Sequence, residues 1–104
     1  ARVAGEPIRA AIAAIGSPLV AEVRGAGLLL GVVLSEPVAG AVSAAAMRNG
    51  LIVNAANESV IRLAPPLIIG AREVEQFARR FGAALAEVEA ELAAQQSTTP
   101  KESA

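Results

Sequence analysis

Residues 19–34, LVAEVRGAGLLLGVVL, contain two different apolar patterns joined by a glycine-rich link. In the first part, LVAEVRG, apolar and polar side chains alternate, which is typical of a strand with one exposed face. The second part, LLLGVVL, is nearly all apolar, which favours a central strand. Gly25, Ala26 and Gly27 predict a tight connection between the two. The segment therefore predicts a β-hairpin, around which the rest of the fold is organised.

The glycines of RGAGLLLG do not form a nucleotide-binding loop. Their spacing is G-x-G-x-x-x-G and they precede a strand, whereas a dinucleotide fingerprint follows a strand and opens a helix. Glycine's freedom at positive φ explains the first two, and close packing explains the third, Gly31.

Three helices and two further strands are predicted outside the hairpin. The first helix has Pro7 in its first turn, carries an apolar stripe of Ile8, Ile12 and Ile15, and is stopped by Gly16-Ser17-Pro18. The second begins at 35–37 and ends at the Asn49-Gly50 pair, which suits a left-handed cap. The third begins near Ala71, with apolar residues at spacings of three and four. Short strands are predicted at 51–53 and 60–63, with a polar connection over 54–59.

This order of elements predicts an α+β fold, with helices packed on a small, mainly antiparallel sheet. The folded domain is expected to span residues 1–94. The remainder, 95–104, is rich in Ser, Thr, Gln and Pro, and a disordered C-terminal tail is predicted there.

Composition excludes several classes of partner and site. The net charge of -1 and the 2% aromatic content predict no nucleic-acid binding. No apolar run is long enough to span a membrane, so no membrane partner is expected. The sequence lacks Cys, which permits a reducing, cytoplasmic setting. It also lacks His, Asp and Tyr, so neither a Ser/His/Asp triad nor a metal site is expected, and the chain is poorly equipped as a free-standing catalyst.

Arg62 lies within an apolar run, VIRLAPPLIIG, at residues 60–70. Burying a guanidinium among aliphatic side chains costs several kcal/mol unless an anion meets it, so a partner is expected. That partner is either a glutamate of the protein or the anion of a substrate. Arg24, on an alternating strand, is interpreted as a surface charge, and Asn54 either caps a turn or orients a ligand.

Two segments, VRGAGLLLGVVL and NGLIVNAANESVIRLAPPLIIGAREVEQF, closely resemble the C-terminal small domain of class III pyridoxal-phosphate aminotransferases. The run NAA ahead of Arg62 resembles the ornithine-type branch. The resemblance implies the small-domain fold of fold-type I enzymes. It also implies that the intact enzyme transfers an amino group between N-acetylornithine and 2-oxoglutarate in arginine biosynthesis. Ornithine, succinylornithine and 4-aminobutyrate enzymes share the outline and remain alternatives.

The resemblance gives Arg62 a role, because the arginine of the R-x-A-P-P-L segment in such enzymes holds the substrate's α-carboxylate. It also implies a cytoplasmic homodimer whose partners are small amino-acid substrates and the remainder of the aminotransferase chain. Pyridoxal phosphate would be bound by an upstream domain carrying the Schiff-base lysine, since the only lysine here is Lys101. No catalytic, cofactor-binding or metal residue is therefore expected in this chain, which alone would be inactive. A different reading, a non-catalytic carboxylate-binding or interaction module, explains the missing acid–base residues without truncation.

Overall fold

The computed structural model describes residues 5–26, 29–63 and 71–103, which form three helices and a four-stranded antiparallel sheet. The elements follow in the order α1 (Gly5–Ile15), β1 (Val20–Ala26), β2 (Leu29–Leu34), α2 (Ala39–Arg48), β3 (Asn54–Asn57), β4 (Val60–Leu63) and α3 (Ala71–Ser103). This confirms the predicted α+β class.

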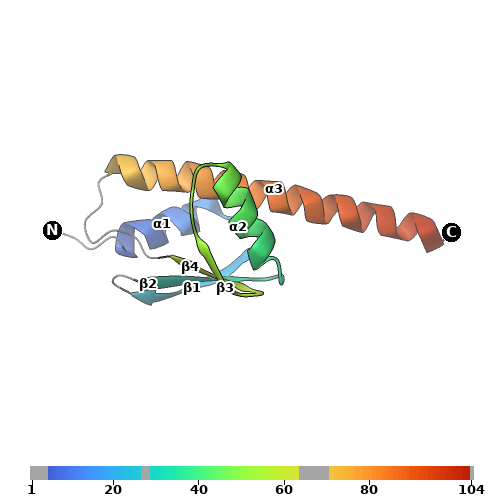
Figure 1. Cartoon of the computed structure of the whole chain (residues 1–104), viewed down its shortest axis with the longest axis horizontal. Coiled ribbons are helices and arrows are strands. Elements are labelled where there is room, and N and C mark those ends of the chain that lie inside the picture. The colour runs from blue at the N-terminus through green and yellow to red at the C-terminus, as the bar shows by residue number, and fades with distance from the viewer. Residues whose placement is uncertain (1–4, 27–28, 64–70, 104) are drawn as a thin grey trace.

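The helices lie on one face of the sheet, whose strand order is β1-β2-β4-β3. In Figure 1 the sheet is at the bottom, α1 and α2 lie above it, and α3 crosses over both helices. The opposite face of the sheet has no helix over it in the described part of the chain (Figure 1).

The core fills the space between the sheet and the helices. Ile8 and Ile12 of α1 are 2% and 1% exposed, so the predicted apolar stripe faces inward. Small side chains, Val42, Ala45 and Ala46, let α2 approach closely. The other large buried side chains are Leu30, Val32, Ile61, Phe81, Leu85 and Val88. Burying each such side chain contributes about 1.5–3 kcal/mol, so this apolar layer supplies the main stabilising term.

The predicted hairpin is present, but its turn is displaced from the prediction. Gly25 and Ala26 belong to β1 and pair with Leu30 and Leu29, rather than forming the connection. Gly27 lies outside the described residues. Gly25 has φ 92, which explains the choice of glycine inside a strand. The Arg9 side chain donates hydrogen bonds to the carbonyls of Val23, at 2.6 Å, and Gly25, which ties α1 to β1.

Helix α2 begins at Ala39, not at the predicted 35–37. Ser35 is committed to the neighbouring connection, since its N–H donates to the Leu19 carbonyl at 2.8 Å and its hydroxyl to the Pro18 carbonyl at 2.9 Å. It therefore does not cap the helix. At the other end Gly50, with φ 81, forms the left-handed cap that the sequence predicted.

The strand predicted at 51–53 is wrong, and β3 instead occupies Asn54–Asn57, within the predicted polar connection. The N–H of Leu51 donates to the Ala46 carbonyl at 2.8 Å, so this residue closes α2 instead of entering the sheet. β3 and β4 form a second hairpin. Its turn is fixed by Asn57, whose side-chain oxygen accepts a hydrogen bond from the Ser59 N–H at 2.9 Å.

Helix α3 begins at Ala71, as predicted. It continues to Ser103, where the sequence predicted a disordered tail, and extends well beyond the rest of the domain (Figure 1). Among the side chains that the structure describes, Leu92 is the last apolar residue of α3 that packs against the core. Beyond that point Ala93, Ala94 and Gln95 are good helix formers, and extending an existing helix costs far less than nucleating one.

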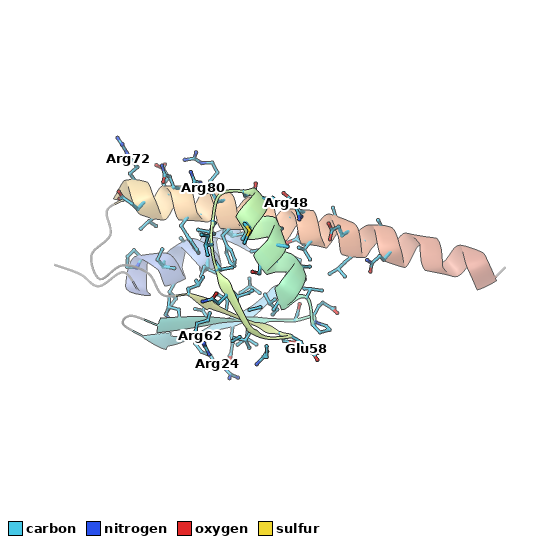
Figure 2. The ribbon with its side chains drawn as sticks, viewed as in Figure 1. Arg24, Arg48, Glu58, Arg62, Arg72 and Arg80 are labelled. Carbon is cyan, nitrogen blue, oxygen red and sulfur yellow. The ribbon has the colours of Figure 1, made fainter. Side chains whose placement is uncertain are left out.

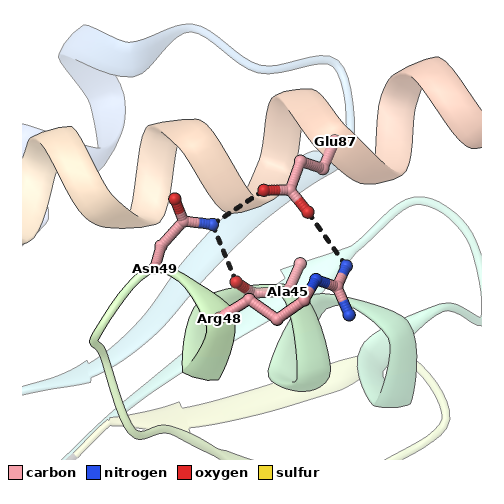
Figure 3. A network of polar contacts seen from close by, with 4 residues as sticks. All are labelled: Ala45, Arg48, Asn49 and Glu87. Carbon is pink, nitrogen blue, oxygen red and sulfur yellow. Dashed lines mark hydrogen bonds and ion pairs between the residues drawn. The ribbon is translucent and has the colours of Figure 1, made fainter.

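A polar network fastens the end of α2 to α3 (Figure 3). The amide nitrogen of Asn49 donates to Glu87 at 2.9 Å and to the Ala45 carbonyl at 2.8 Å, and Arg48 pairs with the other oxygen of Glu87 at 2.9 Å. The hydrogen bonds that Asn49 and Arg48 donate to Glu87 hold its pKa below the ordinary value of 4.5, and the one from Asn49 has the larger effect.

Candidate functional site

A row of residues crosses the open face of the sheet and contains Arg62. The Cα atom of Arg62 on β4 pairs with Gly31 on β2 and with Asn54 on β3, and Gly31 in turn pairs with Arg24 on β1. Paired residues on neighbouring strands point to the same face. The four residues therefore lie side by side on the face opposite the helices.

The expectation that Arg62 is buried is wrong. Its neighbours Ile61 and Leu63 are 0% and 6% exposed and face the core, whereas Arg62 is exposed. Alternation in β4 puts every second residue outward, and the sequence VIRL is too short to show this clearly. Figure 2 shows Arg62 and Arg24 on the side of the sheet that faces away from α3. Arg72 and Arg80, by contrast, lie on α3 itself.

The charge of Arg62 is uncompensated in the described part of the chain. No ion pair or hydrogen bond joins its guanidinium to residues 5–26, 29–63 or 71–103, so the predicted glutamate partner is not found there. Arg24 differs, because its side chain forms an ion pair with Glu22 on the same strand. Its interpretation as a surface charge is consistent with its 71% exposed side chain. On the open face of the sheet, Arg62 is therefore a guanidinium that is available to an external anion.

Asn54 is not a turn residue. It lies in the edge strand β3, exposed and directly across from Arg62, and the nearby turn uses Asn57. The turn role of Asn54 is therefore wrong. The other role, orienting a ligand, stays a prediction, and Asn54 shares the open face with Arg62. Pro65 and Pro66, which follow Arg62 in the sequence, lie outside the described residues.

Gly31 was assigned only to close packing by sequence reasoning, and its place between the two arginines was missed. The period-two pattern of β2 could have found it, because Leu30 and Val32 are core residues and Gly31 must then face outward with Arg24 and Arg62.

The described residues contain neither a metal-binding cluster nor a helix able to span a membrane. No group of three acidic, His or Cys side chains stands close enough there to hold a metal ion. No helix among them combines the length and the apolar character needed to cross a membrane.

Both the sequence and the fold of this chain are similar to those of known proteins. Residues 1–85 match the profile of the family described as aminotransferase class-III. An acetylornithine aminotransferase of Streptomyces coelicolor is 53% identical over 72 residues, covering 69% of this chain and 18% of the relative. One from Mycolicibacterium smegmatis is 48% identical over 85 residues, covering 82% of this chain and 22% of the relative. The chain therefore belongs to the class III aminotransferase family.

The fold agrees with a solved member of the family. The crystal structure of N-acetylornithine aminotransferase from Stenotrophomonas maltophilia superimposes with a TM-score of 0.75 and 37% identity, covering 81% of this chain and 24% of that one. The sequence-based recognition of the family is thereby confirmed. The chain spans about a fifth of the length of the curated relatives that it matches.

Proposed function

We propose that this chain is the C-terminal small domain of a pyridoxal-phosphate-dependent acetylornithine aminotransferase. The intact enzyme would transfer an amino group between N-acetylornithine and 2-oxoglutarate in arginine biosynthesis. The observation that carries the proposal is Arg62, a guanidinium on the open face of the sheet with no counter-charge among the described residues. The acetylornithine aminotransferases at 48% and 53% identity support the choice of substrate.

Arg62 would bind the α-carboxylate of the substrate. A guanidinium is planar and presents parallel N–H groups that match the two oxygens of a carboxylate, so it fixes the orientation of the anion as well as its charge. Both N-acetylornithine and 2-oxoglutarate carry an α-carboxylate, and one arginine can serve both half-reactions in turn. Asn54, across the ladder from Arg62, offers an amide to the same region of the face.

The residues of this chain do not fit pyridoxal phosphate by themselves. The cofactor requires an amine, a phosphate cradle and an acidic partner for its ring nitrogen. The only lysine, Lys101, lies near the C-terminal end of α3, which extends away from the sheet (Figure 1). The cofactor, which serves as the electron sink of amino-group transfer, would therefore be held by another part of the enzyme.

Two features support a larger protein around this domain. Within the described ranges, the sheet face that carries Arg62 has no helix over it, and Ile52 and Met47 are 82% and 64% exposed. Exposed apolar side chains of this size favour a contact with the remainder of the aminotransferase chain. We further propose the cytoplasmic homodimer implied by the family resemblance, with its active site at the subunit interface.

The function is tested with the intact enzyme and a panel of amino donors. N-acetylornithine, succinylornithine, ornithine and 4-aminobutyrate are each supplied with 2-oxoglutarate, and glutamate formation gives kcat/KM. The proposal expects the highest kcat/KM with N-acetylornithine. A higher value with another donor would reassign the substrate, and no transfer from any donor would favour the non-catalytic carboxylate-binding module.

A further inference from the structure

Gly31 occupies a position where the fold itself favours a side chain. β2 lies between β1 and β4, and a glycine inside such a central strand costs about 0.5–1 kcal/mol relative to alanine. Gly31 is not among the described glycines with positive φ, which are Gly16, Gly25 and Gly50, so its backbone does not require glycine. Its conformation is one that any residue adopts.

Packing does not require a glycine at this position either. A Cβ atom added to Gly31 would meet Val60 Cγ1 at 3.6 Å, which is ordinary van der Waals contact. A β-branched side chain there would even favour the strand. The absence of a side chain therefore destabilises the sheet without a compensating contact among the described residues.

Position 31 lies between two arginines on the open face of the sheet. Gly31 is the direct partner of both Arg24 and Arg62, so it separates the two guanidinium-bearing side chains on the open face. With strands about 4.8 Å apart, the two arginine Cα atoms stand about 10 Å from each other. The gap is one side chain wide, and its floor is the bare backbone of β2.

We propose that Gly31 is a specificity-determining residue for the amino-acid substrate. Its bare backbone is the floor against which the α-carboxylate end of the substrate lies when Arg62 binds it. Arg24, whose charge is already paired with Glu22, bounds the other side of the gap. A side chain at position 31 fills the gap and pushes the carboxylate off the Arg62 fork. This inference rests on the proposed function.

The test introduces bulk at position 31 in the intact enzyme. Gly31→Val should raise KM for N-acetylornithine at least about tenfold, since a few misplaced methyl groups change discrimination by that order, while kcat falls less. Gly31→Ala should show a smaller rise, and the melting temperature should stay level or increase in both. Val33→Ile is the matched control, because it adds bulk on the same strand and face but in the next row, beside Glu22 and Val60.

The outcomes distinguish a failure of the Gly31 role from a failure of the proposed function. A KM within twofold of wild type for both Gly31 variants, or an equal rise in the Val33→Ile control, would overturn the role of Gly31. If Arg62→Lys loses activity in the same assay while the Gly31 variants do not, the proposed carboxylate anchor stands and only this inference fails. If neither position affects the kinetics, both fail. Should Gly31→Val not fold, Gly31→Ala decides.

Discussion

Arg62 pairs with Gly31 across the ladder between β4 and β2, so the neighbour of the arginine toward β1 has no side chain. On its other side Arg62 pairs with Asn54. A cation flanked by a bare backbone and an amide is open to a ligand from the solvent side. This arrangement links the sheet register to the proposed binding of a carboxylate.

Gly50 holds the connection that leads from α2 to β3 and should not tolerate alanine. Its φ of 81 is left-handed, and a Cβ there would lie 3.4 Å from the Arg80 guanidinium, which donates to the Gly50 carbonyl. Gly50→Ala should lower the free energy of unfolding by about 1–2 kcal/mol, measured by chemical denaturation of the chain. Gly40, in α2 with nothing within 4 Å of its Cβ position, is the control, and Gly40→Ala should stabilise by up to about 1 kcal/mol. Equal effects of Gly50→Ala and Gly40→Ala on the free energy of unfolding would contradict the left-handed cap at Gly50.

Glu87 should give a pH-dependent contribution to stability. Hydrogen bonds from Asn49 and Arg48 lower its pKa below 4.5, so its contribution is complete above that pH and is lost as the pH falls through the lowered pKa. Glu87→Gln should therefore reduce the melting temperature of the chain at pH 7 and have little effect well below pH 4.5.

The control for Glu87 is Glu91→Gln, one turn further along α3 on an exposed position. It should leave the melting temperature unchanged at both pH values. If Glu87→Gln lowered the melting temperature equally at pH 7 and in acid, the network would act through packing and not through the charge of the carboxylate.

Pyridoxal phosphate should not form a specific adduct with this chain alone. The only amines in the sequence are the chain's N-terminal amine and Lys101, and Lys101 lies far along α3. After borohydride reduction, mass spectrometry should find only weak labelling at those amines, rising with cofactor concentration. A stoichiometric adduct at low cofactor concentration, with a strong long-wavelength band, would contradict the assignment of the cofactor site to another part of the enzyme.

Ile52 should matter only where the rest of the enzyme is present. Its side chain is 82% exposed, so Ile52→Ser should leave the melting temperature of the chain alone almost unchanged. In the intact enzyme the same change should lower thermal stability, because an apolar contact is lost. Val53, the buried neighbour at 8% exposure, is the contrasting position, and Val53→Ser should destabilise both. An unchanged intact enzyme with Ile52→Ser would show that the exposed side chain is not covered.

The sequence predicted the elements that have a clear period. The stripe of Ile8 and Ile12 and the helix beginning at Ala71 are present, because burial repeats along them for several turns. Short elements were less predictable. LIV at 51–53 reads as a strand by composition, but the cap at Gly50 uses the Leu51 N–H, and the strand forms one step later at Asn54. Tertiary hydrogen bonding decided the outcome there.

The environment of Arg62 was not predicted from the sequence. Arg62 was selected as a cation in need of an anion because it was expected to be buried. It is exposed and has no counter-charge in the described ranges, so its binding of an anion stays a prediction. Its burial was inferred from neighbouring apolar letters, which in a strand belong to the opposite face. The row of Arg24, Gly31 and Arg62 depends on strand register, which no single segment of sequence contains.

The carboxylate-binding role of Arg62 is tested by removing the arginine fork and the substrate carboxylate in the same cycle. Wild-type intact enzyme and Arg62→Lys are each assayed with N-acetylornithine and with the same donor lacking its α-carboxylate. Lysine keeps the charge but loses the two parallel hydrogen bonds, so kcat/KM for N-acetylornithine should fall at least about thirtyfold, or ~2 kcal/mol. For the decarboxylated donor, Arg62→Lys should leave kcat/KM almost unchanged from its wild-type value. Equal losses for the two donors, or a lower melting temperature with unchanged kcat/KM, would show that Arg62 serves the fold and does not bind the substrate.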